Sequence, residues 1–237
     1  MRDGSGKWVP SQWEALLAKA LEALDSLGGA AGFWTFGGGN ALAQDLGQRV
    51  SYDVDVFLDS HRALRLLAPN VNPVTKAICD TWQWQGAYLK LIVKDVGGID
   101  FLNSSAFTDD PTTDFGFRER VIPRERPAEV IAKKLIYRAS TFKKRDMFDL
   151  AGTWLFARDE VLKAAGTPYV TADRIKAAIN RIELGQGLFQ SQMRRDVNPT
   201  ERGETFIDQA CEIALEALRE MRRVPRSGFD DAPPPPR

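Results

Sequence analysis

The sequence has little of several features that define common protein classes. It contains one histidine, His61, so mechanisms that need a histidine pair, triad or cluster are excluded. Its two cysteines, Cys79 and Cys211, lie far apart, which argues against a disulfide framework or a zinc cluster and for a reducing compartment. No apolar run approaches the roughly 20 residues of a membrane span, and the N-terminus lacks the apolar core of a signal peptide. We therefore expect a cytoplasmic protein that has no membrane contact.

The chain also lacks a net charge, since 32 Lys and Arg balance 32 Asp and Glu. This excludes a uniformly basic nucleic-acid coat and an acidic tail carrier. The charge is nevertheless uneven: Arg118 to Arg145 contains ten Lys or Arg and three Glu, whereas residues 95–117 contain five Asp and neither Lys nor Arg. An acidic side that faces a basic side suits an enzyme that handles polyphosphate. Solvated helix faces and loops are the alternative interpretation.

Three consecutive glycines, Gly37 to Gly39, separate two segments of different pattern. Residues 33–36 predict a short strand, and residues 40–47 predict a helix. A glycine turn between a strand and a helix exposes backbone N–H groups and points a helix N-terminus at whatever lies above it. The pattern therefore predicts a phosphate-binding turn.

Two aspartates follow on the next predicted strand, residues 52–58. Because successive side chains on a strand alternate faces, Asp53 and Asp55 project together while Val54 and Val56 face the core. Two carboxylates side by side in a dry site repel each other unless a cation lies between them. Hard oxygen ligands of this kind suit Mg²⁺ or Mn²⁺, so the spacing predicts a metal site.

Periodicity, caps and alternation predict the remaining elements. An amphipathic helix is expected over residues 10–27, a strand or hairpin over 82–94, and a short strand over 99–102 that places Asp100 and Phe101 on opposite faces. His61 follows a helix cap and is expected to be a surface residue. Further helices are expected over residues 61–68, 73–79, 127–140, 142–156, 158–165, 171–184 and 203–222.

Four segments carry a resemblance to a known family. Residues 38–42 (Gly-Gly-Asn-Ala-Leu) are similar to its Gly-Gly-Thr/Ser-Ala-Leu motif, and residues 49–57 match its Arg-x-Ser-x-Asp-x-Asp-x-Phe motif. Residues 132–138 and 145–150 resemble its lysine-bearing helix and its Arg/Lys-Asp-x-x-Asp-Leu helix. The sequence thus resembles the AbiEii/AbiGii toxins, a branch of the nucleotidyltransferases that share a catalytic core with DNA polymerase β. Asn40 departs from the family's hydroxyl, although an amide can also donate to a phosphate oxygen.

The resemblance implies an α/β (α+β) fold: a small mixed sheet of the polymerase β-like nucleotidyltransferase core, flanked by helices and followed by a C-terminal helical lobe. We expect the nucleotidyltransferase core at residues 1–125 and the helical lobe that completes the cleft at residues 126–226. Residues 227–237, which include Pro233 to Pro236, are expected to form a disordered tail.

The resemblance also assigns roles to residues. By order and context, Asp100 corresponds to the third carboxylate of polymerase β-like sites, which holds the catalytic metal and helps to take the proton from an attacking hydroxyl. Asp53, Asp55 and Asp100 are therefore the expected metal ligands and, with Lys134, the expected catalytic residues. The expected nucleotide-binding residues are Gly38, Gly39, Asn40, Arg49, Ser51, Arg138, Asp146 and Asp149.

Lys134 and Arg138 lie four residues apart and so share one helix face. We expect them to clamp the β and γ phosphates of a nucleoside triphosphate, and a solvated cationic stripe is the alternative. Lys133 is a weaker candidate because it points about a third of a turn away. Asp146 and Asp149 either form part of the active-site wall or orient Lys134 or Arg138 through ion pairs.

The implied function is that of a metal-dependent nucleotidyltransferase, the toxin of a bacterial toxin–antitoxin or abortive-infection system. It would transfer a nucleoside monophosphate from an NTP to an RNA hydroxyl, most plausibly a tRNA 3′ end, and release pyrophosphate. Its implied cofactor is Mg²⁺ or Mn²⁺, and its implied partners are the NTP, the RNA acceptor and a cognate antitoxin. The alternatives are transfer to a protein or small hydroxyl compound, and an inactive nucleotide-binding module.

Overall fold

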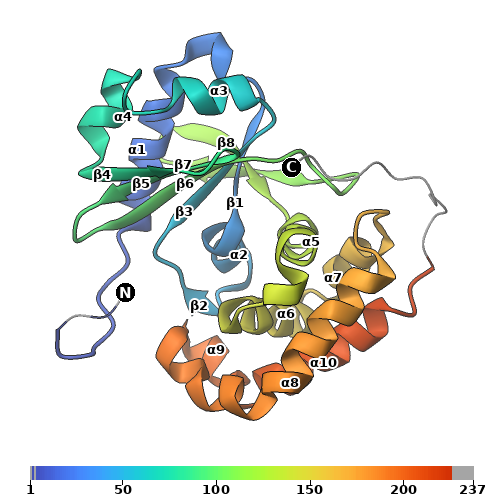
Figure 1. The fold of residues 1–237 in the computed structure, drawn as a ribbon. Helices are drawn as coiled ribbons and strands as arrows, with labels where there is room; N and C mark the ends of the chain where they lie inside the picture. The colour runs from blue at the N-terminus through green and yellow to red at the C-terminus, as the bar shows by residue number, and fades with distance from the viewer. Residues whose placement is uncertain (1, 3, 226–237) are drawn as a thin grey trace.

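The computed structural model describes residue 2 and residues 4–225, and its centre is a seven-stranded mixed sheet (Figure 1). The strands of this sheet are β1 (Trp34–Gly37), β3 (Val54–Leu58), β4 (Thr81–Trp84), β5 (Tyr88–Val93), β6 (Gly97–Asn103), β7 (Thr112–Phe117) and β8 (Arg120–Glu125). They lie side by side in the order β4-β5-β6-β3-β1-β8-β7.

The strand directions bring residues that are distant in sequence into one row across the central strands of this sheet. β3 pairs with β6 and β1 pairs with β8 in the parallel sense, whereas the other neighbours are antiparallel. Because β1 and β3 run in opposite directions, the last residue of β1, Gly37, pairs with Asp55 near the start of β3. The same row continues into β6, where Asp100 is the partner of Asp55.

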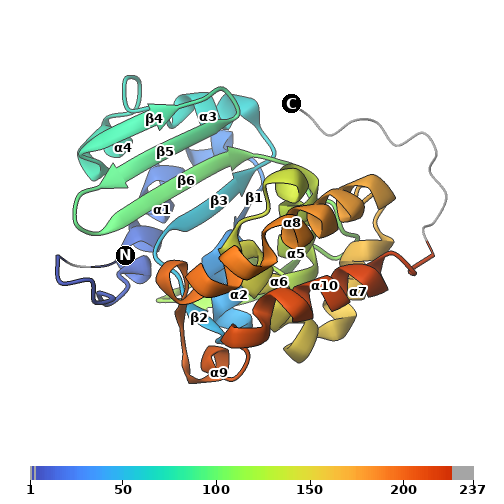
Figure 2. The ribbon, with the colours of Figure 1, turned by 60° about the horizontal axis from the view of Figure 1, so that its bottom comes forward.

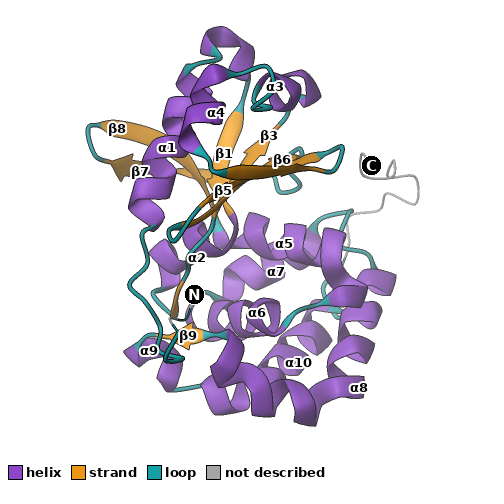
Figure 3. Ribbon diagram, turned by 60° about the vertical axis from the view of Figure 1, so that its left-hand side comes forward, coloured by secondary structure: helices purple, strands orange, loops and turns teal. Residues whose placement is uncertain are grey.

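Helices cover both faces of the sheet (Figure 3). The helices α1 (Trp13–Asp25), α3 (His61–Leu66) and α4 (Pro73–Ile78) lie on one face, and α2 (Gly38–Leu46) lies on the other. Apolar residues of α1 and of the strands, such as the fully buried Leu16, form the first hydrophobic core. The Ser60 side chain caps α3, as expected from the sequence before His61.

The second half of the chain forms a helical layer with its own hydrophobic core (Figure 2). Fully buried residues from several helices, among them Leu135, Phe148 and Leu218, form this core. The helices are α5 (Pro127–Arg138), α6 (Lys144–Phe156), α7 (Arg158–Gly166), α8 (Ala172–Asp196), α9 (Glu201–Glu204) and α10 (Ala210–Met221).

A short two-stranded sheet ties the helical half to the segment that follows α2. The strand β2 (Arg49–Val50) pairs with β9 (Asn198–Pro199). The Thr200 hydroxyl donates to the carbonyl of Gly47, and the Thr200 N–H donates to the carbonyl of Gln48 at 3.2 Å. These contacts fix the backbone immediately before Asp53.

The expected fold class is confirmed, but several expected boundaries are wrong. The helix expected over residues 171–184 continues to Asp196, because apolar side chains such as Phe189 and Met193 keep its inner face buried. The helix expected over residues 203–222 is divided into α9, a 3₁₀ turn and α10. The β7–β8 hairpin was not expected, since its exposed face interrupts the apolar alternation.

The structure does not test the expected C-terminal tail or the expected domain boundary. The expected tail at residues 227–237 lies outside the described residues, and the expected domain boundary near residue 125 stays a prediction. Within residues 4–225, no helix has both the length and the apolar composition that a membrane span requires.

The space around two glycines, Gly203 next to β9 and Gly187 in α8, predicts opposite effects of their substitution by alanine. Gly203→Ala should lower the free energy of unfolding by roughly 1–3 kcal/mol, because the new methyl group would overlap the carbonyl oxygen of Gln48. Gly187→Ala should raise it by about 0.4–1 kcal/mol, because this exposed position in α8 has room for the methyl group. Urea unfolding measures both values. Equal effects would contradict the close packing of the Gly203 backbone against Gln48.

Candidate active site

The glycine turn forms one wall of the candidate site. Gly37 is the extended N-cap of α2, and Gly38 has a φ of +65°, a conformation that glycine adopts without strain. A Cβ at Gly38 would overlap the carboxylate of Asp55, and a Cβ at Gly39 would overlap the guanidinium of Arg49. The glycines are therefore needed both for the turn and for the close approach of these two side chains.

Asp55 and Asp100 lie beside each other on the adjacent parallel strands β3 and β6. Burial raises the pKa of Asp55, and the neighbouring charge of Asp53 raises it further. Burial together with the charge of Asp55 raises the pKa of Asp100 to about 6. Strand pairing thus brings two carboxylates together in a partly buried site.

Asp53 lies just before β3 and not within it as the sequence predicted. Its Oδ1 accepts a hydrogen bond from the N–H of Gly98 at 2.9 Å, which fixes the carboxylate beside the start of β6. The side-chain amide of Asn40 donates to the backbone carbonyl of Asp53. Asn40 thus holds the Asp53 backbone, and its expected contact with phosphate stays a prediction.

Sequence reasoning missed two residues of this cluster, Tyr88 and Lys90 on β5. Lys90 Nζ lies 3.2 Å from both carboxylate oxygens of Asp100. Burial and the charge of Asp100 raise the pKa of the Tyr88 hydroxyl. Both side chains interrupt an otherwise apolar strand at alternate positions, and this was the signal that they share the face of Asp100.

Two adjoining cavities open onto the paired carboxylates. One, of about 230 Å³, is lined mainly by charged residues, including Lys90, Arg138, Lys143 and Arg145. The other, of about 420 Å³, extends along β3 and β6 toward α5 and has a largely apolar wall. Its lining includes Phe57, Leu102, Val130 and Tyr137, with Glu125 and Lys133 at one side.

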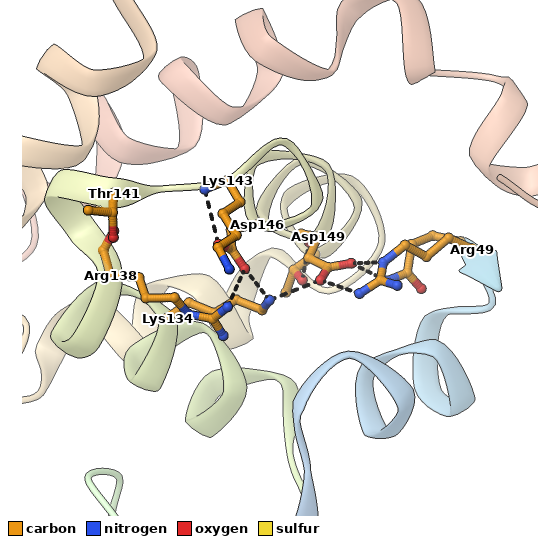
Figure 4. Close-up of polar contacts among 9 residues, drawn as sticks. Arg49, Lys134, Arg138, Thr141, Lys143, Asp146 and Asp149 are labelled. Carbon is orange, nitrogen blue, oxygen red and sulfur yellow. Dashed lines mark hydrogen bonds and ion pairs between the residues drawn. The ribbon is translucent and has the colours of Figure 1, made fainter. Parts of the chain in front are cut away.

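Along one wall of the polar cavity, buried ion pairs connect α5, α6 and β2 (Figure 4). Lys134 Nζ lies 2.6 Å from Asp146 Oδ1 and 3.1 Å from Asp149 Oδ2. Arg49 binds Asp149 through two hydrogen bonds, at 2.6 and 2.8 Å. Burial would raise the pKa of Asp149, but the charges of Arg49 and Lys134 outweigh it and hold that pKa below its usual value.

These contacts favour one of the two interpretations of Asp146 and Asp149, namely that they orient Lys134 through ion pairs. Lys134 is 5% exposed and its ammonium is already paired twice, so it is no free phosphate clamp as the structure stands. Arg138 is different, because its side chain is 42% exposed and its nearest carboxylate, Asp146, is 3.7 Å away. Arg138 therefore remains able to bind an anion in the cavity.

Three other basic residues of the Arg118 to Arg145 segment also divide into a buried, ion-paired one and exposed ones. Lys133 is paired with Glu125 and with Glu129, at 3.3 Å for the latter, and contributes no free charge. Lys143 and Arg145, in contrast, line the polar cavity and have no ion-pair partner in the described part of the chain. Fewer basic residues of this segment are therefore free to bind an anion than its sequence suggested.

A divalent cation fits the chemistry of the three aspartates, although no group of three or more His, Cys, Asp or Glu side chains in residues 2 and 4–225 is arranged as a metal site. Oδ1 of Asp100 is buried and has no hydrogen-bond partner among these residues, since Lys90 donates to Oδ2. Carboxylate oxygens are the preferred ligands of Mg²⁺. A cation between Asp55 and Asp100 would offset the repulsion between these two carboxylates.

Comparison with solved structures gives several matches, among them three proteins described as nucleotidyltransferases or adenylyltransferases. A proposed nucleotidyltransferase from H. pylori matches with a TM-score of 0.51 and 15% identity, over 90% of this chain and 96% of that chain. The lincosamide antibiotic adenylyltransferase LnuA matches with a TM-score of 0.41 and 15% identity, over 57% of this chain and 94% of that chain. The nucleotidyltransferase toxin MenT4 from Mycobacterium tuberculosis matches with a TM-score of 0.41 and 16% identity, over 89% and 94%.

The first of these likenesses shows that the chain has a nucleotidyltransferase fold. Comparisons of sequence alone found no matching family model and no similar curated protein.

The buried ion pairs predict that two neighbouring cations differ in their effect on stability. Lys134→Met should lower the free energy of unfolding by about 3–5 kcal/mol, because Asp146 and Asp149 would lose a buried partner. Arg138→Ala should lower it by less than about 1 kcal/mol, because its ion pair is long and exposed. Chemical denaturation measures both. A Lys134 variant as stable as the Arg138 variant would contradict the buried network.

The raised pKa of Asp100 predicts a pH dependence of stability in the metal-free protein. The folded pKa of about 6 exceeds the ordinary aspartate value of 3.8, so the folded state binds more protons between these values and its stability falls as the pH rises from about 4 to 6. Asp100→Asn should flatten this slope and be more stable than the native chain at pH 7, by up to about 3 kcal/mol. Thermal unfolding in a chelating buffer at several pH values tests this. An unchanged slope would show that Asp100 is not the responsible group.

Proposed function

We propose that the protein is a metal-dependent nucleotidyltransferase that transfers a nucleoside monophosphate from an NTP to a hydroxyl and releases pyrophosphate. One observation carries the proposal: the glycine turn at the end of β1 meets the Asp55–Asp100 row, at the mouth of a cavity lined with cations. An anion-binding turn beside metal-binding carboxylates is the arrangement that phosphoryl transfer requires.

The polar cavity is the proposed triphosphate site. The turn at Gly38 and Gly39 offers backbone N–H groups. Arg138, whose ion pair with Asp146 is long at 3.7 Å, offers a positive charge, and so do Lys143 and Arg145. Charge-assisted hydrogen bonds to phosphate are stronger than neutral ones, so these residues hold the donor and stabilise the departing pyrophosphate. Arg49 and Lys134 line the same cavity, and their ion pairs with Asp149 fix the positions of β2 and α6.

Asp53, Asp55 and Asp100 are the proposed ligands of Mg²⁺ or Mn²⁺. A bound cation would lower the pKa of the attacking hydroxyl and neutralise charge on the phosphates. The chain's own part is to hold the three carboxylates together, through the β3–β6 pairing and the hydrogen bond from Gly98 to Asp53. The apolar cavity beside them suits a nucleoside, since its wall offers Phe57 and Tyr137 and its volume of about 420 Å³ is that of a small-molecule site.

The proposed acceptor is RNA, most plausibly a tRNA 3′ end, and the proposed biological role is that of a toxin with a cognate antitoxin. These finer assignments rest on the resemblance of residues 38–57 and 132–150 to the AbiEii/AbiGii toxins. Lys143 and Arg145, at the outer end of the polar cavity, are able to contact an RNA backbone. The two free thiols, Cys79 and Cys211, agree with the reducing cytoplasm in which such a reaction would take place.

The decisive experiment compares the possible acceptor classes. The purified protein is incubated with each labelled NTP, Mg²⁺ and either total RNA or a protein extract. We expect label in the RNA. Label in protein or in small molecules would replace the acceptor and keep the enzyme class, whereas nucleotide binding without any transfer would favour an inactive nucleotide-binding module.

Asp55→Asn should lower the transfer rate by at least about a hundredfold while the fold remains, because the variant loses a charge that holds the metal. Asp114→Asn is the matched control, since Asp114 is an exposed residue of β7, the outer strand of the sheet, three strands away from β3. Single-turnover transfer rates and circular dichroism are compared for both variants. Full activity of the Asp55 variant would refute the metal-dependent mechanism.

A further inference from the structure

Lys90 stands in the same row of residues as the proposed metal ligands. In the antiparallel pairing of β5 with β6 its partner is Asp100, and in the parallel pairing of β6 with β3 the partner of Asp100 is Asp55. Residues paired across neighbouring strands project from the same face of a sheet. A lysine is thus built into the strand next to the carboxylates.

The end of the Lys90 side chain also lies on the side of Gly98 where Asp53 is found. A Cβ at Gly98 would lie 2.8 Å from both Cε and Nζ of Lys90, and 3.2 Å from Oδ1 of Asp53. The ammonium therefore passes over the bare backbone of Gly98, whose N–H donates to that same Asp53 oxygen. Any larger residue at position 98 would push the ammonium out of this place.

The ammonium is the counter-ion of the cluster in this structure. Within residues 2 and 4–225, Lys90 is the residue that forms an ion pair with one of the three aspartates, at 3.2 Å from Asp100. Lys134 forms its ion pairs with Asp146 and Asp149, and Arg138 with Asp146, so these two cations act on Asp55 only through space. In the described part of the chain, Lys90 is therefore the cation in direct contact with a carboxylate of the cluster.

An ammonium and a divalent cation cannot both lie between the same carboxylates, because they repel each other and compete for the same oxygens. We propose that Lys90 is a built-in counter-ion that holds Asp53, Asp55 and Asp100 together in the metal-free protein and is displaced when the divalent cation binds. The inference rests on the proposed function, and it makes Lys90 a determinant of metal affinity. The Lys90 side chain also lines the polar cavity, so it has room to turn away from Asp100.

The test is a titration with Mn²⁺ alone, without nucleotide and at low ionic strength, in which the free hydrated ion is counted by electron paramagnetic resonance. Lys90→Met should bind Mn²⁺ on the order of tenfold more tightly than the native chain, because no ion pair has to be broken. The metal-free variant should also melt at a lower temperature, since its carboxylates lose their counter-ion, and saturating Mn²⁺ should raise its Tm more than that of the native chain. Lys90→Gln removes the charge but keeps a hydrogen-bond donor, and it serves the same test if the methionine variant does not fold.

Two control variants separate this inference from the proposed function. Lys94→Met makes the same change at an exposed position just after β5 and should leave Mn²⁺ affinity unchanged. Equal or weaker binding by the Lys90 variants than by Lys94→Met would overturn the counter-ion role. Asp55→Asn should weaken Mn²⁺ binding, and if it does not, the three aspartates do not form the metal site and the proposed function fails instead.

Discussion

The candidate site depends on the buried series of charges that runs from Arg49 through Asp149 and Lys134 to Asp146. Its members come from β2, α6 and α5, so this one network joins the segment before Asp53 to the helical half of the chain. Removal of one partner would leave an uncompensated charge in the interior, which costs far more than the intact pairs contribute. The network therefore specifies how the two halves meet more strongly than it stabilises either half.

This constraint decides which cations are free. Lys133 and Lys134 are adjacent in sequence, yet each is taken up by its own pair of carboxylates inside the protein. The exposed Arg138, Lys143 and Arg145 remain for an anionic ligand. The cavity lies between a fixed row of aspartates and a few free cations. This arrangement suits the proposed triphosphate, whose negative charges the proposed metal and these cations would share.

The carboxylate cluster shows the opposite energetics. Asp55 and Asp100 are held together by strand pairing although their charges repel, and burial raises the pKa values of both. Such an arrangement lowers the stability of the protein, because the sheet imposes a proximity that the proposed metal would use. Lys90 moderates this cost from the neighbouring strand.

The sequence by itself determined the parts of the site that depend on local geometry. The glycine turn, the strand–turn–helix around it and the shared face of Lys134 and Arg138 all follow from residues at most a few positions apart, where backbone conformation limits the possible arrangements. The mixed α/β fold class followed from the family resemblance.

Only the tertiary structure decided which charges meet. Arg49 and Asp149 are separated by 100 residues, and nothing local to either one names the other. Lys90 reaches Asp100, and β9 reaches β2, only because the sheet and the helical layer bring their backbones into register. Burial settles the outcome, because an ionic side chain excluded from water must take the nearest opposite charge, and that charge is set by packing and not by sequence position.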